Sequence, residues 1–162
     1  MTAQFGETLK YNGVNYYLAT EPLEPYLEKH NIKFYAWCTA CWRGYTSKWS
    51  IEDGMLYLTD LHGFISTDED GGLMNKSVGM DYLFPGQDKV LADWYSGVLR
   101  LPHGEIIRYI HQGYDSIYEK ELLLKIVNGK CVGVREIRMS SNKSWFGRLL
   151  QKLGLDRSNS SK

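Results

Sequence analysis

Hydrophobic and polar residues alternate along three parts of the chain, and an Asn-Gly or Asp-Gly pair lies near the centre of each. These parts run from Leu9 to Leu18, from Trp49 to Leu58 and from Leu122 to Val134. A two-residue turn needs positive φ at both central positions, which Asn, Asp and Gly tolerate. Alternation with a period of two is typical of strands that bury one face. The sequence therefore predicts three antiparallel β-hairpins.

The position of each turn also predicts which residues lie opposite each other. The expected pairs are Ile51–Leu56 and Trp49–Leu58 around Asp53-Gly54, and Ile126–Cys131 and Leu123–Val134 around Asn128-Gly129. In the hairpin around Asn12-Gly13, the residues expected on one face are Leu9, Tyr11, Val14, Tyr16 and Leu18.

Strand-like patterns also cover residues 32–38, 92–101 and 105–111. Between the last two, Pro102-His103-Gly104 is typical of a type I turn closed by a bulged glycine, which predicts a further hairpin. Residues 21–30 contain two prolines and are interpreted as a crossing segment with about one helical turn. Residues 62–79 are interpreted as an irregular loop, and their acidic run, Asp68 to Asp70, lacks the spacing of a calcium loop.

The pattern changes to helical spacing near the C-terminus, where the apolar residues are Trp145, Phe146, Leu149, Leu150 and Leu153. This predicts an amphipathic helix at 144–153, within a segment 143–155 that packs on a β-rich domain 1–142, and a disordered tail at 156–162. Docking of the helix on a partner or a membrane surface is the alternative. The predicted fold is mainly β: an antiparallel meander of hairpins forming a curved sheet, sandwich or partly open barrel of about eight to ten strands.

Charge is unevenly distributed, although the 162 residues carry a formal net charge of zero. Residues 143–162 hold five basic residues and one acid, a net charge of +4, so the remainder carries −4. An acidic body argues against a nucleic-acid partner. No apolar run approaches the roughly 20 residues of a membrane span, and the N-terminus does not resemble a secretion signal. With three cysteines, an odd number, these features predict a cytoplasmic protein.

The cysteines include a Cys-x-x-Cys motif, Cys38 to Cys41. A redox-active dithiol of the thioredoxin type requires a following helix, but the next residues are strand-like. A zinc site requires further ligands at suitable spacing, which Cys131 and the four histidines do not supply. If both motif cysteines lay in one strand, they would point to opposite faces. We therefore predict no metal site, no catalytic dithiol and no cofactor.

Aromatic and polar residues gather at 93–119, and these are the candidate binding residues: Trp94, Tyr95, Tyr109, His111, Tyr114 and Tyr118. A hairpin across Pro102-His103-Gly104 would bring the first two beside the others. Such residues supply large, stiff contact areas at protein interfaces, although they also pack well in sheets. His111 with Asp115 or Glu119 would be the start of an acid–base site.

Several motifs in these regions resemble those of a set of small bacterial proteins to which no activity is assigned. They are Cys41-Trp-Arg-Gly-Tyr45, Trp49-x-Ile51, Asp93-Trp-Tyr-Ser-Gly97 and His111-x-Gly-Tyr114. The resemblance covers residues 1–138 and implies a stand-alone, β-rich bacterial domain.

The leading functional hypothesis is a non-catalytic protein that binds a macromolecule, as the immunity or antitoxin partner of a bacterial toxin. An acidic body suits a basic partner, because complementary fields speed association. The alternative is a small-molecule binder with an aromatic-lined pocket. An enzyme that uses His111 and a nearby carboxylate is the third hypothesis.

Overall fold

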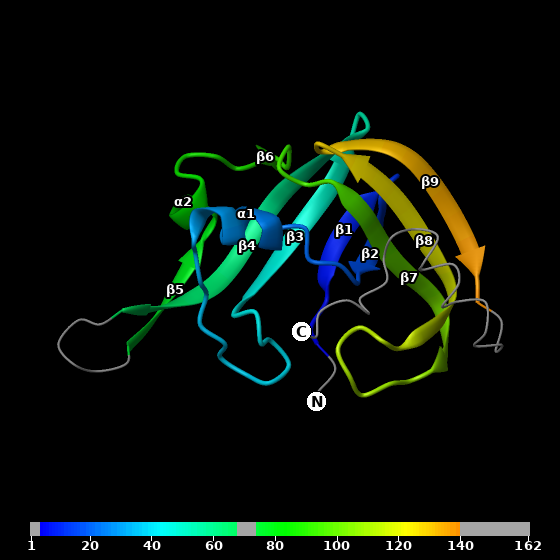
Figure 1. The fold of residues 1–162 in the computed structure, drawn as a ribbon, viewed down its shortest axis with the longest axis horizontal. Helices are drawn as coiled ribbons and strands as arrows, with labels where there is room; N and C mark the ends of the chain where they lie inside the picture. Colours follow the sequence, from blue (N-terminus) through cyan, green and yellow to red (C-terminus); the bar gives the residue numbers. More distant parts are fainter. Residues whose placement is uncertain (1–3, 68–73, 140–162) are drawn as a thin grey trace, which may run out of the picture.

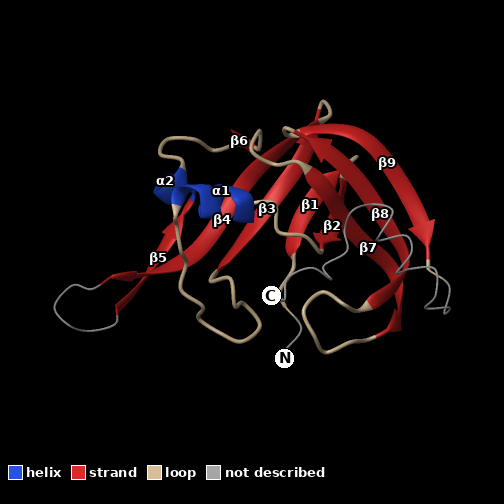
Figure 2. Ribbon diagram, in the orientation of Figure 1, coloured by secondary structure: helices blue, strands red, loops and turns tan. Residues whose placement is uncertain are grey.

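The computed structural model describes residues 4–67 and 74–139, so the predicted C-terminal helix and tail lie outside the described residues. Within these described residues the fold is mainly β, with two short helices (Figures 1 and 2). The strands are β1 (Glu7–Tyr11), β2 (Val14–Leu18), β3 (Tyr45–Glu52), β4 (Met55–Thr67), β5 (Met74–Gly79), β6 (Val90–Leu91), β7 (Gly97–Arg108), β8 (Ile117–Val127) and β9 (Lys130–Arg138), and the helices are α1 (Glu24–His30) and α2 (Met80–Leu83). No helix in the described part of the chain is long and apolar enough to span a bilayer.

The strands form one open, mixed sheet of nine strands. Its main order is β2-β1-β3-β4-β9-β8-β7, and β5 and β6 pair with β4 beside this path. β1 and β3 are parallel, so the prediction of a wholly antiparallel meander is wrong at this position. The reason is the connection through α1, because a crossing segment between strands permits parallel pairing where a tight turn does not.

The three predicted hairpin turns are confirmed. Their central residues all have positive φ: Asn12, Gly13, Asp53, Gly54, Asn128 and Gly129. The pairs Ile51–Leu56, Trp49–Leu58 and Ile126–Cys131 are also confirmed. Leu123 lies opposite Arg135 rather than Val134, because a bulge at Val132 shifts the ladder by one residue.

The predicted turn at Pro102-His103-Gly104 is wrong. β7 continues through these residues and pairs with β8 on both sides of an irregularity, and Gly104 has a φ of +81° within it. Proline cannot donate a backbone hydrogen bond, but it is tolerated in a strand at the end of the sheet order. The turn-like sequence therefore produces a bulge in an end strand.

Two other predictions also differ from the structure. Residues 32–37 form no strand and belong to an irregular loop between α1 and β3, at residues 32–44. Much of 62–79, predicted to be irregular, lies in β4 and β5, which pair from His62–Gly79 to Thr67–Met74. Both errors have the same cause. Local composition does not reveal which distant strand, if any, a segment pairs with.

The core lies on the sheet face that carries Leu9, Trp49, Leu58, Leu99 and Leu124, all of which are fully buried. Burying each such side chain contributes about 1.5–3 kcal/mol relative to exposure. The segment containing α1 adds Leu23 and Leu27 to this core. At the ends of the strand order, the backbone N–H of Ala19 donates to the carbonyl of Arg100 (2.9 Å). The chain just after β2 thereby contacts β7.

We expect Gly129→Ala to destabilise the fold more than Gly54→Ala. Both glycines have positive φ, but a Cβ on Gly129 would lie 2.8 Å from the Ala92 carbonyl oxygen, whereas nothing lies within 4 Å at Gly54. Gly54→Ala should lower the free energy of unfolding by about 1 kcal/mol, and Gly129→Ala by more than about 3 kcal/mol. Urea denaturation measures both, and equal losses would contradict the predicted close contact.

Candidate functional site

Three segments meet at one end of the sheet: residues 4–6, the loop 32–44 and the loop 109–116 (Figure 1). The backbone N–H of Gln4 donates to the Gly113 carbonyl (3.2 Å), and its side-chain oxygen accepts from the N–H of Trp42 (3.1 Å). The N–H of Phe5 donates to the Ala40 carbonyl (2.7 Å). Residues 4 and 5 therefore join the two loops.

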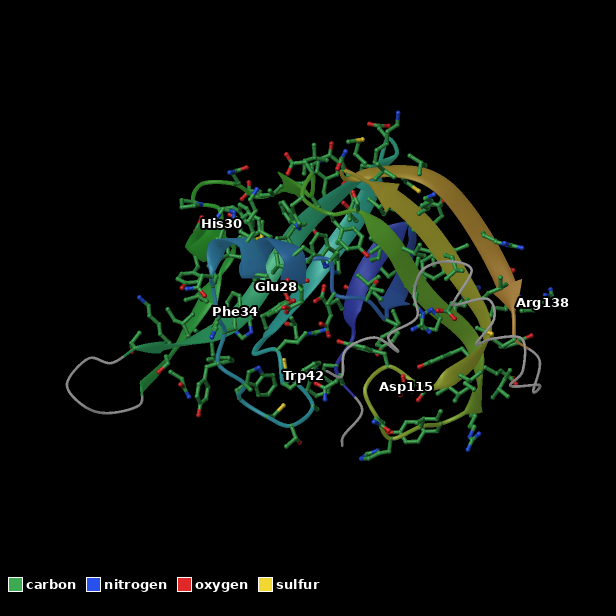
Figure 3. All side chains as sticks on the ribbon, viewed as in Figure 1. Glu28, His30, Phe34, Trp42, Asp115 and Arg138 are labelled. Atoms are coloured by element: carbon green, nitrogen blue, oxygen red, sulfur yellow. The ribbon has the colours of Figure 1, made fainter. Side chains whose placement is uncertain are left out.

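Large aromatic side chains are exposed at this end. Phe5 is 49% exposed, Trp37 46% and Trp42 61%. The rings of Phe5 and Trp37 stack with centroids 6.2 Å apart, and Trp37 also contacts Phe64 of β4. We call Phe5, Trp37 and Trp42 the loop surface. Figure 3 shows Trp42 on this loop and Asp115 on the neighbouring one.

The loop 32–44 is held to β4 by backbone hydrogen bonds. The Tyr35 N–H donates to the Phe64 carbonyl (2.6 Å), and the Phe64 N–H donates to the Gly44 carbonyl (3.1 Å). Gly44 has a φ of +77°, and a Cβ there would lie 2.5 Å from the Tyr35 carbonyl oxygen. Only glycine fits this close approach.

Beneath the loop surface lies the buried guanidinium of Arg43. Its Nη2 donates to the carbonyl of Phe5 (2.9 Å), and its Nη1 donates to the hydroxyl of Tyr114. Nη1 also lies 3.5 Å from Glu21 Oε1 and 3.6 Å from Glu7 Oε1. One side chain therefore connects the N-terminal segment, both loops and the residues that follow β2.

Glu7 is a buried carboxylate on β1, where it shares the inner face with Leu9. Its Oε2 accepts hydrogen bonds from the Ser47 hydroxyl and the Trp49 indole N–H, both on β3. Burial raises the pKa of Glu7 to about 7, outweighing Arg43 and these hydrogen bonds, which lower it. Burial also lowers the pKa of Arg43, but Glu7 and its other neighbours raise it above its usual value, so Arg43 remains cationic.

The polar cluster extends to α1 through Tyr45, whose hydroxyl donates to Glu24 Oε1 (2.8 Å). Burial raises the pKa values of both Tyr45 and Glu24. Glu7 Oε1 and Arg43 Nε are buried without a hydrogen-bond partner in the described residues. The cluster is thus a buried support for the loop surface, with its charge balanced inside the protein.

The structure separates the predicted binding residues. Tyr95 is 8% exposed, and Trp94 is half-buried against Tyr26 and Phe84. The Trp94 indole N–H donates to the Pro22 carbonyl (2.9 Å). Because β7 is continuous, its whole length separates these residues from those that follow Arg108. The expected single cluster is therefore wrong.

The other four predicted residues lie nearer the loop surface. Tyr109 is 61% exposed, and its hydroxyl hydrogen-bonds His111 Nδ1 (3.0 Å). Tyr114 is bonded to Arg43, and Tyr118 stacks on Tyr17 (centroids 6.5 Å apart). The polar partner of His111 in the described residues is thus Tyr109, not Asp115 or Glu119.

Sequence reasoning missed five residues of this site: Phe5, Glu7, Trp37, Trp42 and Arg43. The aromatic residues from Phe34 to Trp42 are visible in the sequence, but the pattern of this region predicts a strand over 32–38. Glu7 also carried a signal, because it falls in register with Leu9 and Tyr11 on the inward face. A carboxylate at a core position usually requires a cationic partner.

Cys38 and Cys41 lie opposite each other across a two-residue turn, not in one strand. The condition on which placement on opposite faces was expected, that both cysteines lie in one strand, is therefore not met. Both thiols are free, as is Cys131, and the Cys41 thiol donates to the Tyr45 carbonyl (3.3 Å). Within residues 4–67 and 74–139, no group of three His, Cys, Asp or Glu side chains is arranged to hold a metal ion.

One hollow in the described surface lies over β1, β3 and β4, on the face of the sheet opposite the core. Its lining includes Thr8, Thr46, Lys48, Asp60 and His62. Lys48 and Asp60 form an exposed ion pair there (3.0 Å). No tryptophan, tyrosine or phenylalanine lines this hollow, unlike the aromatic pocket expected for a small-molecule binder.

We expect Glu7→Gln to change the pH dependence of stability. The folded pKa of Glu7 is raised to about 7, so its favourable contribution is complete below its unfolded pKa and is lost as the pH rises through 7. Between pH 4.5 and 8 the wild type should lose about 3 kcal/mol of unfolding free energy from this group, and Glu7→Gln should not. Urea denaturation across this range, with the exposed Glu52→Gln as control, measures the effect. If the difference in unfolding free energy between the wild type and Glu7→Gln did not change with pH, this prediction would be wrong.

We also expect two tryptophans to respond differently to truncation. Trp94→Ala removes a packed ring and should cost about 3–5 kcal/mol of unfolding free energy. Trp42→Ala removes an exposed ring and should cost less than about 1 kcal/mol. Thermal and urea denaturation compare them directly. A large loss for Trp42→Ala would show that its ring supports the fold.

Comparison with known proteins gives no match: no family model, no curated protein and no solved structure matches the chain.

Proposed function

We propose that the protein is a non-catalytic module that binds another protein through the loop surface. The observation that carries this proposal is the stacked pair of exposed rings, Phe5 and Trp37, with the exposed ring of Trp42 on the same loop. Contiguous exposed apolar groups on soluble proteins mark interaction sites. Tryptophan is among the residues that contribute most to binding free energy at protein interfaces.

The fixed backbone supports this role. Binding costs free energy when loops and side chains must be ordered. Here the loop is already ordered by its hydrogen bonds to Phe64 and by Arg43 beneath it. The rings of Phe5 and Trp37 already stack on each other. Most of the free-energy cost of ordering this loop therefore arises during folding and not during binding.

The partner class that fits is a basic bacterial toxin, which this protein would neutralise. Apart from residues 143–162, the chain carries a net charge of −4. An acidic body attracts a basic partner and speeds its association, especially at low salt. The aromatic rings would then supply the short-range part of the binding free energy.

We expect the double variant Trp37→Ala/Trp42→Ala to lose partner binding while keeping its fold. A partner is captured from the source cells with the wild-type protein as bait, purified, and titrated by calorimetry against each variant. Loss of one interface tryptophan costs about 2 kcal/mol or more, so affinity should fall at least about 30-fold. The partner should arrest growth when produced alone, and the wild-type protein should restore growth.

Val14→Ala is the matched control, because Val14 is 51% exposed and lies at the β1–β2 turn, away from the loop surface. It should bind the partner as the wild type does. Full affinity in the double tryptophan variant would overturn the assignment of the loop surface. A partner that is harmless to growth would overturn the toxin class while leaving the surface in place.

A further inference from the structure

We propose that Cys38 and Cys41 form a reversible disulfide, which makes the loop 32–44 a redox-modification site that changes the loop surface. The chemistry of the pair stands independently of any partner. Its consequence for binding rests on the proposed function.

The backbone places the two cysteines as a disulfide requires. They form an isolated antiparallel bridge, and the Cys41 N–H donates to the Cys38 carbonyl (3.1 Å). Hydrogen-bonded antiparallel pairs have Cα atoms about 5.5 Å apart, inside the range of roughly 4.4–6.8 Å found for disulfides. Residues directly opposite in such a pair project to the same side. The two sulfur atoms can therefore meet without a change of backbone path.

The exposure of the two thiols determines the order of reaction. Cys38 is half-buried and can meet a solute, whereas Cys41 is fully buried. Burial raises the pKa of the Cys41 thiol, which makes its thiolate scarce at neutral pH. Cys38 is thus the attacking thiol and Cys41 the resolving one.

The oxidant is a low-molecular-weight disulfide, such as oxidised glutathione. The Cys38 thiolate attacks one of its sulfur atoms, the S–S bond breaks, and one glutathione thiolate leaves. The Cys41 thiolate then attacks the Cys38 sulfur of the mixed disulfide, and the second glutathione thiolate leaves. Two protein thiols have lost two protons and two electrons, and the oxidant has become two thiols.

The bond would act directly on the loop surface. Trp37 precedes Cys38 and Trp42 follows Cys41 in the chain, so both rings are attached beside the new link. The disulfide also removes the thiol hydrogen that Cys41 donates to the Tyr45 carbonyl. An excess of a low-molecular-weight thiol breaks the bond again by the reverse exchange, in which the thiolate attacks one of the two protein sulfur atoms. The modification is therefore reversible.

The test equilibrates the full-length protein with mixtures of reduced and oxidised glutathione, blocks free thiols with an alkylating reagent and identifies the linked cysteines by peptide mass spectrometry. Wild type and Cys131→Ser should both form the Cys38–Cys41 link, with the loss of two hydrogen atoms, and dithiothreitol should reverse it. Cys38→Ser and Cys41→Ser should form no intramolecular link. The rate of linking should rise with pH, because the Cys41 thiolate becomes more abundant.

Tryptophan fluorescence reports the effect on the surface without a partner. The emission of the wild type should change on oxidation, and that of Cys38→Ser should not. Free thiols at both positions in excess oxidised glutathione, or a mixed disulfide that persists on Cys38, would overturn the site. A link that forms without changing either the fluorescence or the affinity for the captured partner would overturn its effect on the loop surface. Failure to find any partner would count against the proposed function alone.

Discussion

A buried charge, the guanidinium of Arg43, joins the segments at the end of the molecule that carries the loop surface. It connects residues 4–6, the segment after β2 and the loop 109–116, none of which is adjacent to it in sequence. Removing a partner from a buried charge typically costs about 3–5 kcal/mol, because the remaining charge is left uncompensated. The hydrogen bonds and ion pairs of Arg43 thus hold these segments together, because losing any of them would leave the buried cation without one of its partners.

Arg43 is also the ion-pair partner of an unusual group in the core, the buried carboxylate of Glu7. β3 presents Tyr45, Ser47 and Trp49 inward, and two of these three donate hydrogen bonds to Glu7. A carboxylate such as that of Glu7 inside a mainly apolar core costs free energy of folding unless its hydrogen bonds are made. The network therefore specifies where β1 lies beside β3 more sharply than apolar packing could. The parallel pairing of these strands places Glu7 next to Ser47, which no tight turn would have done.

Local chemistry made some parts of this fold predictable. Asn12, Asp53 and Asn128 each precede a glycine, and each adopts the positive φ that a two-residue turn demands. The local structure at Pro102 could not be predicted from the sequence, because a Pro-x-Gly segment is compatible with both a turn and a bulge in an end strand. The bulge at Val132 likewise depends on how β9 meets β8. Trp94 and Trp42 are chemically identical side chains, and only the tertiary structure decides which of them is buried.

The meeting of the two ends of the strand order has a consequence for how the chain is made. The backbone of Gln4 bonds to Gly113 and the backbone of Ala19 bonds to Arg100, and both partners are synthesised much later. The final contacts of the β1–β2 hairpin therefore cannot form until Arg100 and Gly113 have been made. Contacts between residues so distant in sequence slow folding. During synthesis, the apolar side chains of Leu9 and Leu18 are left without their final covering, so the nascent β1–β2 hairpin is a substrate for a chaperone that holds exposed apolar segments.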